Sequence, residues 1–264
     1  NVFYSLPNHD FLFFQGKCKK LSDTAKQQDT VHTAVYEKII NPFICFDIYM
    51  PLLVQGCHYR CNPFCLHNVP PYYFNLPDSA ILHFYDTLAE QVKGSVLLYN
   101  FPDRTGHDLS PELIYRLVSE HENIVGIKDT VATMGHTRAI IQKVKKEFPN
   151  FMVYSGFDEF FGHNVLSGGD GCVAGLSNFA PEVASAYANA ARNDDLEKMA
   201  QCQQKIDSLM AIYDVAPQFI PTIKKAMAVR GIQMEPVCAQ PLLPATEEET
   251  GKIREILKHA GLKE

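Results

Sequence analysis

Two apolar runs, each ending abruptly in reactive side chains, limit what this chain can fold into. The runs are Ser-Val-Leu-Leu-Tyr-Asn-Phe-Pro at residues 95–102 and Asn-Ile-Val-Gly-Ile-Lys-Asp-Thr at residues 123–130. Unbroken apolar runs of this length are typical of strands in a parallel sheet that is covered on both faces. Between them, residues 109–118 predict a helix, with Ser110 as N-cap and Pro111 in its first turn. The sequence therefore predicts a β-α-β unit of an α/β fold.

Tyr99 and Lys128 stand near the ends of these two predicted strands. In α/β barrels the carboxyl ends of the strands hold the chemistry, so we expect both side chains in one site. A lysine there is either a salt-bridging rim residue or a nucleophile. A desolvated amine loses its proton more readily, and the free amine can attack a ketone to form a Schiff base. The phenol of Tyr99 would carry the protons that imine formation and cleavage require.

Five motifs in register resemble the dihydrodipicolinate synthase / N-acetylneuraminate lyase superfamily. They are Tyr-Asn-Phe-Pro (99–102), Arg-Thr-Gly-His-Asp-Leu (104–109), Gly-Ile-Lys-Asp-Thr (126–130), Ser-Gly-Phe-Asp (155–158) and Gly-Gly-Asp-Gly (168–171). The resemblance spans residues 69–262 and implies a TIM (β/α)8 barrel with extra C-terminal helices. It also implies a pyruvate-dependent class I aldolase, with Lys128 as the Schiff-base lysine and Tyr99 as its acid/base partner. No metal or other cofactor is expected in that mechanism.

Three further candidate residues lie in the first half of the motif-bearing region. Tyr73 matches a tyrosine that crosses a dimer interface into the neighbouring active site, and wall packing is the alternative. Arg104 suits bidentate binding of a substrate carboxylate, or else a surface ion pair. Thr130 matches a threonine that contacts substrate hydroxyls in sugar-acid aldolases. The alternative is that Thr130 and Thr133 cap the next helix.

Three residues farther along the chain complete the expected binding set. Gly156 permits close approach of the backbone to a ligand. Asp158 can accept hydrogen bonds from a polyol, or it can stabilise the first turn of the following helix. Ser177 lies at the end of the last predicted strand, residues 172–177. With Thr130, these residues favour a 2-keto-3-deoxy sugar acid as substrate.

Two other functions stay open from the sequence. Arg-Thr-Gly at residues 104–106 is similar to dihydrodipicolinate synthase, whose substrate presents an extra carboxylate. The second alternative is a catalytically impaired barrel fragment, because the Thr-Pro-Phe and Thr-Gly-Glu loops typical of the family are missing. Each strand-helix unit needs roughly 30 residues, so the residues before Val69 are too few for the expected three units and the start of a fourth.

We therefore expect an anomalous N-terminal segment (1–66) that is truncated, altered over short stretches by a shifted reading frame, or wrongly assigned. A barrel remainder (67–193) and a C-terminal helical region (194–264) follow. The segment holds five of the eight cysteines. Cys57, Cys61 and Cys65 with His58 and His67 could ligate zinc or an iron–sulfur cluster. Their spacing matches no standard metal motif, so free thiols are the preferred interpretation.

Charge and composition limit the kinds of binding partner that we expect. The chain of 264 residues has 24 basic and 30 acidic residues, a net charge of -6, which favours neither nucleic acid nor an anionic membrane. Its most apolar stretch, residues 39–54, is broken by prolines and polar residues and predicts no membrane span. No secretory signal is visible, and the cysteine content favours a reducing cytoplasm. The expected partners are a small 2-oxo acid and further copies of the chain, in a homotetramer built as a dimer of dimers.

Overall fold

The structure, a computed structural model, describes residues 2–5 and 65–263. These residues fall into two compact units. Among the described residues, the N-terminal unit comprises 65–154 and 167–169, and the C-terminal unit comprises 2–5, 155–166 and 170–263. The sequence-based division at residues 66 and 193 follows other boundaries and stays a prediction. Most of the anomalous segment, residues 6–64, lies outside the described residues.

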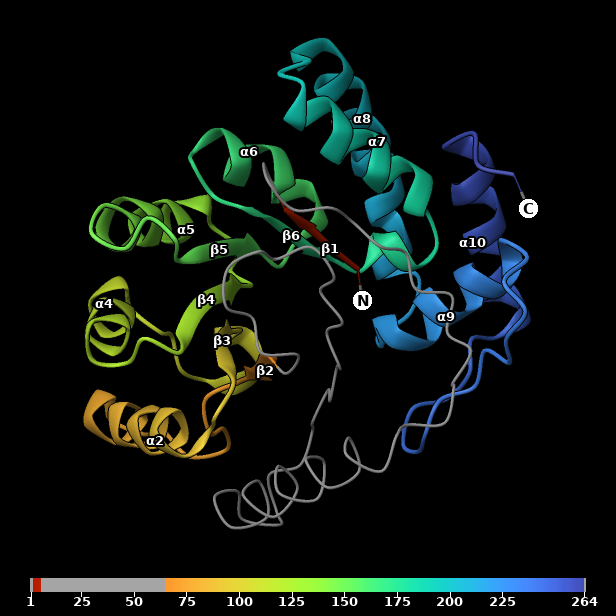
Figure 1. Ribbon diagram of the computed structural model, residues 1–264. Coiled ribbons are helices and arrows are strands. Elements are labelled where there is room, and N and C mark those ends of the chain that lie inside the picture. Colours follow the sequence, from red (N-terminus) through yellow and green to blue (C-terminus); the bar gives the residue numbers. More distant parts are fainter. Residues whose placement is uncertain (1, 6–64, 264) are drawn as a thin grey trace, which may run out of the picture. The chain divides into compact units, whose positions relative to one another are not determined.

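The N-terminal unit is built from parallel β-α units (Figure 1). Its strands lie in the order β5-β4-β3-β2, and β5 ends on the first residue of the C-terminal unit. The strands are β2 (Cys65–Asn68), β3 (Ser95–Asn100), β4 (Ile124–Asp129) and β5 (Met152–Ser155). The helices are α2 (Asp78–Gln91), α3 (Pro102–Thr105), α4 (Pro111–Glu120) and α5 (Met134–Ile140), the last continued by a π-helical turn at Ile141–Lys145.

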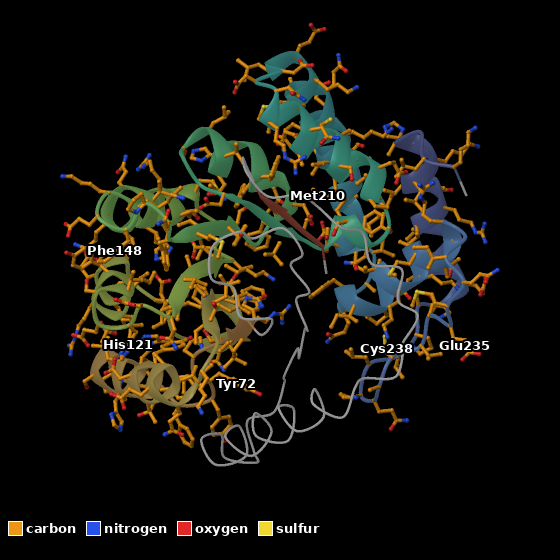
Figure 2. All side chains as sticks on the ribbon, viewed as in Figure 1. Tyr72, His121, Phe148, Met210, Glu235 and Cys238 are labelled. Carbon is orange, nitrogen blue, oxygen red and sulfur yellow. The ribbon has the colours of Figure 1, made fainter. Side chains whose placement is uncertain are left out.

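The β-α-β unit predicted from the sequence is confirmed as β3–α4–β4. Ser110 is the N-cap of α4, and its side chain accepts a hydrogen bond from the backbone N of Leu113 at 3.2 Å. Pro111 occupies the first helical turn, where its missing N–H leaves no bond unmade. At the other end, His121 lies beside α2, with its Nε2 3.0 Å from Oδ1 of Asp86 (Figure 2).

The core of this unit lies between one face of the sheet and helices α2, α4 and α5 (Figure 1). Leu98 of β3 and Ile127 of β4 are fully buried there against Ile114 of α4. Successive side chains of a strand point to opposite faces. Tyr99, which follows Leu98, therefore points to the face away from these helices.

A β-bulge at Val125 decides which side chains of β4 share the face of Tyr99. Ile124 and Ile127 are three residues apart, yet both are buried in the same core. A regular strand would place them on opposite faces, whereas one extra residue restores the alternation. As a result, Ile127 aligns with Leu98, and Lys128 aligns with Tyr99.

Gly126 of β4 lies close to the backbone of β5. A Cβ atom at this position would lie 2.6 Å from the backbone O of Met152 and 2.8 Å from Cδ1 of Leu97. The nearer of these atoms belongs to the backbone, which cannot turn aside as a side chain can. The close approach of the two strands therefore requires glycine.

We predict that Gly126→Ala lowers the free energy of unfolding by about 1–3 kcal/mol, the usual effect of overpacking. Gly135→Ala is the matched control, because a Cβ there meets nothing within 4 Å. It should leave the free energy of unfolding unchanged or raise it by up to about 1 kcal/mol. Urea unfolding followed by circular dichroism measures both, and equal effects at the two glycines would contradict the close packing of β4 on β5.

The C-terminal unit pairs β1 (Val2–Ser5) antiparallel with β6 (Gly171–Ala174). Helix α7 packs against α8, and α9 packs against α10. The longer helices are α6 (Phe161–Leu166), α7 (Pro181–Arg192), α8 (Leu196–Leu209), α9 (Phe219–Val229) and α10 (Glu247–His259). Short 3-10 turns lie at Asp158–Phe160, Leu176–Asn178 and Met210–Asp214. The last helix begins with a capping box, in which Thr246 and Glu249 satisfy each other's backbone N–H groups.

Within residues 2–5 and 65–263, none of the helices combines the length and the apolar character needed to cross a membrane.

Candidate active site

Tyr99 and Lys128 lie side by side at the carboxyl ends of β3 and β4. They are aligned in the parallel register, and Nζ of Lys128 lies 4.2 Å from the centroid of the Tyr99 ring. Both side chains are half-buried. An ammonium group over the face of a phenol ring is attracted by the electron density of the ring. The amine and the phenol thus have the proximity that the sequence predicted for them.

The alternative for Lys128, a salt bridge at the rim, is not what the described residues show. The lysine ion pairs in this part of the chain include Lys143 with Glu112 at 3.0 Å and Lys252 with Glu248 at 2.8 Å. In this part of the chain Lys128 contacts the ring of Tyr99 instead of a carboxylate. Its assignment as a nucleophile stays a prediction.

A hydrogen-bonded network ties the two strand ends together directly after Tyr99 and Lys128. The side-chain amide of Asn100 donates to Oδ1 of Asp129 at 2.9 Å and to Oδ1 of Asp108 at 2.8 Å. The backbone O of Asn100 accepts from the backbone N of Thr130 at 2.8 Å. Because the network begins one residue beyond the reactive pair, it holds both strand ends in place.

The side chain of Asp129 is fully buried and receives two more partners from α5. The hydroxyl of Thr137 donates to its Oδ2 at 2.6 Å, and Nδ1 of His136 lies 3.0 Å from the same oxygen. On its other side, Nε2 of His136 lies 3.4 Å from Oδ1 of Asp108. Burial alone lowers the pKa of His136, but the hydrogen bond and charge of Asp129, with the charge of Asp108, raise it above its ordinary value. In its protonated form the ring compensates the charge of the buried carboxylate.

Sequence reasoning named neither Asp129 nor His136 as part of the site. The available signal was the position of Asn100 and Asp129, which are the polar residues that close two buried strands. The sequence offers no comparable signal for His136, since it lies seven positions after Asp129, beyond an irregular turn.

The raised pKa of His136 predicts a pH-dependent stability. A group with a raised folded-state pKa stabilises the protein fully below its unfolded-state pKa, about 6.5, and this contribution is lost as pH rises through the folded-state value. Urea unfolding of the wild type should thus show stability falling as pH rises above about 6.5. His136→Gln should remove that fall, whereas His83→Gln, an exposed position on α2, should keep it. An unchanged pH profile in His136→Gln would contradict the assignment.

Thr130 follows the network and has a hydroxyl without a partner among the described residues. The side chain is buried, with 4% of its surface exposed. Thr133 occupies the N-cap position of α5 but makes no side-chain capping bond. Neither threonine therefore caps α5 through its hydroxyl. Substrate binding by Thr130 remains the prediction for that atom.

Arg104 lies exposed on the short helix α3. Its guanidinium carbon is 5.9 Å from the centroid of the Phe101 ring. Among the described residues no carboxylate pairs with it, so the alternative of a surface ion pair is not seen there. The guanidinium group is accessible to an anion.

Tyr73 projects into solvent after β2, with 87% of its side chain exposed. Its φ angle of 84° lies in the left-handed region, which is strained for a bulky residue. Its ring meets that of Phe74 edge-on, with centroids 5.0 Å apart. Among the described residues, the Tyr73 side chain is therefore not packed into a wall of the site, which was the alternative.

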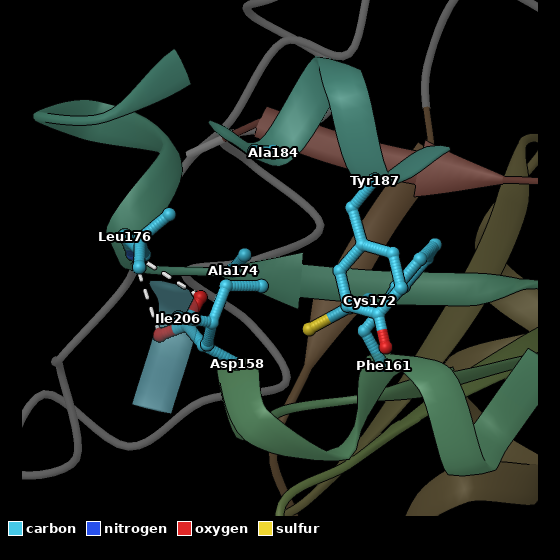
Figure 3. Close-up of a pocket in the computed structure, with 8 residues that line it drawn as sticks. All are labelled: Asp158, Phe161, Cys172, Ala174, Leu176, Ala184, Tyr187 and Ile206. Carbon is cyan, nitrogen blue, oxygen red and sulfur yellow. Dashed lines mark hydrogen bonds between the residues drawn. The ribbon is translucent and has the colours of Figure 1, made fainter. Parts of the chain in front are cut away.

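Gly156, Asp158 and Ser177 belong to the C-terminal unit. Asp158 is buried and accepts a hydrogen bond from the Tyr213 hydroxyl at 2.5 Å. It also accepts one from the backbone N of Leu176 at 3.2 Å (Figure 3). Burial, then the charge of Asp158, raises the pKa of the Tyr213 phenol well above its ordinary value. Ser177 donates to the backbone O of Ala174 at 2.7 Å, and half-buried Gly156 follows β5.

Asp158 also lines a cavity of about 10 Å³, room for about one water molecule. Figure 3 shows the cavity lining, which is mostly apolar: Phe161, Cys172, Ala174, Leu176, Ala184, Tyr187 and Ile206. The hydrogen bonds that Asp158 makes within its own unit agree with a structural role. Its proposed contact with a polyol stays a prediction.

The metal-binding alternative stays untested, because Cys57 and Cys61 lie outside the described residues. Within the described ranges, one group of three potential ligands lies close enough together for a metal ion, namely Asp86, Glu120 and His121. Glu120 is exposed and pairs with Arg116 at 2.9 Å. His121 already contacts Asp86. The group is satisfied by protein partners.

Comparisons with known proteins all point to the same family. The model of the dihydrodipicolinate synthetase family matches residues 63–260. The probable 2-dehydro-3-deoxy-D-pentonate aldolase YjhH of Escherichia coli is 39% identical over 194 residues, which are 74% of this chain and 64% of YjhH. The putative 2-dehydro-3-deoxy-D-gluconate aldolase YagE of Escherichia coli is 32% identical, with the same coverage of the two chains. The matched region thus spans less than two thirds of these relatives.

Solved structures agree with the sequence comparison. The crystal structure of YagE from Escherichia coli in complex with pyruvate matches with a TM-score of 0.73 at 31% identity, covering 75% of this chain and 66% of that one. Dihydrodipicolinate synthase from Thermotoga maritima matches with a TM-score of 0.69 at 29% identity, covering 74% and 65%. These neighbours confirm the predicted fold class, an α/β barrel of the TIM type with additional C-terminal helices.

Proposed function

The chain belongs to the dihydrodipicolinate synthetase family, and on that premise we propose that it is a pyruvate-dependent class I aldolase with Lys128 as its Schiff-base lysine. The observation that carries the proposal is the position of the Lys128 amine, 4.2 Å from the Tyr99 ring at adjacent strand ends. A nucleophilic amine needs a proton carrier at hand, and a phenol can serve as one. The reaction needs no metal, because the iminium itself withdraws electrons.

The proposed reaction begins when Nζ of Lys128 attacks the ketone carbon C2 of a 2-oxo acid and water leaves. The resulting iminium accepts the electron pair of the C3–C4 bond as that bond breaks. The C4 hydroxyl loses its proton and the departing fragment becomes an aldehyde. The remaining enamine takes up a proton at C3, and hydrolysis then releases pyruvate and regenerates the amine. Tyr99 carries protons to and from the C2 and C4 oxygens.

Trapping with borohydride tests the nucleophile. Incubation of the protein with pyruvate and borohydride should add one reduced pyruvate to Lys128, because borohydride converts the imine into a stable amine. Lys128→Ala should abolish the adduct, since no other group is proposed to form the imine. Lys128→Arg should abolish it too, because the guanidinium group stays protonated. Peptide mass spectrometry locates the label.

Lys143→Ala serves as the matched control for this experiment. Lys143 also lies over an aromatic ring, 5.5 Å from the centroid of Tyr115, but it is paired with Glu112. The control should label as fully as the wild type. Labelling of a lysine other than Lys128 would refute the assignment, and a folded wild type that takes up no label would favour a catalytically impaired barrel.

For the substrate, we propose a 2-keto-3-deoxy sugar acid. The named relatives YjhH and YagE are described as aldolases of such acids, and the buried hydroxyl of Thr130 has no partner among the described residues. Asp158 and Ser177, with the backbone at Gly156, belong to the same proposal as contacts of the polyol. A pocket built to hydrogen-bond hydroxyl groups selects substrates that carry them.

The second candidate is 4-hydroxy-tetrahydrodipicolinate synthase, which condenses pyruvate with aspartate semialdehyde. The accessible guanidinium group of Arg104 favours it, since that substrate adds a carboxylate. Cleavage of 2-keto-3-deoxygluconate and condensation of aspartate semialdehyde with pyruvate are therefore the two activities to compare.

We predict that the protein cleaves the sugar acid. Thr130→Val should lower kcat/KM for this cleavage about tenfold, whereas Arg104→Ala should change kcat/KM less than about twofold. The tenfold figure corresponds to about 1.4 kcal/mol for a lost hydrogen bond. Coupled assays of pyruvate release and of condensation give both rates. Efficient condensation that depends on Arg104, with little effect of Thr130→Val, would favour the synthase.

Two properties of the whole protein complete the proposal. Tyr73, exposed and in a left-handed conformation, would act as a proton relay in the site of a neighbouring copy, within a dimer of dimers. Cys172, Cys202 and Cys238 form no disulfide bond within the described part of the chain, which favours a reducing compartment, the cytoplasm.

A further inference from the structure

His67 of β2 lies next to the reactive pair. It aligns with Leu97 of β3, and the imidazole stacks on the Tyr99 ring with centroids 4.7 Å apart and planes inclined by 19°. Strand β3 lies between β2 and β4, so the phenol has the imidazole on one side and the amine of Lys128 on the other. The three side chains form one row on the sheet face away from α2 and α4.

The imidazole of His67 is held without charge. Burial, and then the positive charge of Lys128, lowers the pKa of His67 to about 3. A neutral imidazole has one nitrogen that donates and one that accepts. It can thus offer an N–H group to a ligand without adding a second positive charge beside the amine.

Nε2 of His67 is buried and has no hydrogen-bond partner among the described residues. Leaving a buried polar atom unsatisfied destabilises the fold, and a leucine or phenylalanine would fill the same place without that loss. Packing against Tyr99 therefore does not account for a histidine. A bound molecule with an oxygen atom at this point does.

We propose that His67 is a further substrate-contacting residue of this site, whose Nε2–H donates a hydrogen bond to an oxygen of the bound 2-oxo acid while its ring keeps the Tyr99 phenol beside Lys128. The inference rests on the proposed function and adds a binding group to it. The ring contact and the hydrogen bond are separable, because phenylalanine preserves the first and glutamine preserves a nitrogen at the position of Nε2.

The test is borohydride trapping over a range of pyruvate concentrations, read by the mass of the intact chain. His67→Phe should raise the half-saturating pyruvate concentration about 5- to 10-fold, as the loss of one hydrogen bond predicts, with the label still on Lys128 at saturation. His67→Gln should stay within about threefold of the wild type. His83→Phe, the same substitution at an exposed position of α2, should leave the value unchanged.

The outcomes separate this inference from the function on which it rests. A wild type that labels at Lys128, together with an unchanged half-saturating concentration in His67→Phe, would overturn the role of His67 alone. A half-saturating concentration in His67→Gln as high as that in His67→Phe would do the same, since the nitrogen at the position of Nε2 would then be irrelevant. A wild type without any label would overturn both proposals. Should His67→Phe fail to fold, as judged by thermal melting, His67→Leu takes its place.

Discussion

The register between β3 and β4 is the constraint on which the rest of the site depends. Ile124 and Ile127 are both required in the core, and the extra residue Val125 is what allows two isoleucines three positions apart to face the same helices. The same bulge turns Lys128 to the opposite face, level with Tyr99. Burial of apolar surface thus determines where the amine points, because any other register would expose an isoleucine or bury the charged lysine among the helices.

The hydrogen-bonded network directly after Tyr99 and Lys128 fixes this register at the strand ends. A buried carboxylate is stable only when its oxygens are satisfied, and Asp129 finds Asn100 on the neighbouring strand and Thr137 and His136 on α5. Each of these partners comes from an element that must be in place for the bonds to form. The network therefore links the strand end that carries Lys128 to the strand and helix on either side of it.

The sequence was informative where periodicity and capping act over short distances. The strands around Tyr99 and Lys128 and the helix begun by Ser110 and Pro111 follow from apolar runs and from one capping pattern. The bulge could not be predicted, because Ile-Val-Gly-Ile is apolar at every position that has a side chain and shows no alternation. The stack of His67 on Tyr99 was also missed. Its strand has only four residues, and histidine next to cysteines indicated a metal ligand more readily than a wall of the site.

A crystal structure of the protein after borohydride reduction in the presence of pyruvate would test this account most directly. Continuous density should run from Nζ of Lys128 to the pyruvate carbon, on the sheet face away from α4. The Tyr99 phenol would lie beside the adduct, and Ile124 and Ile127 would both be in the core. Lys128 on the helix side of the sheet, or an adduct on another lysine, would contradict it.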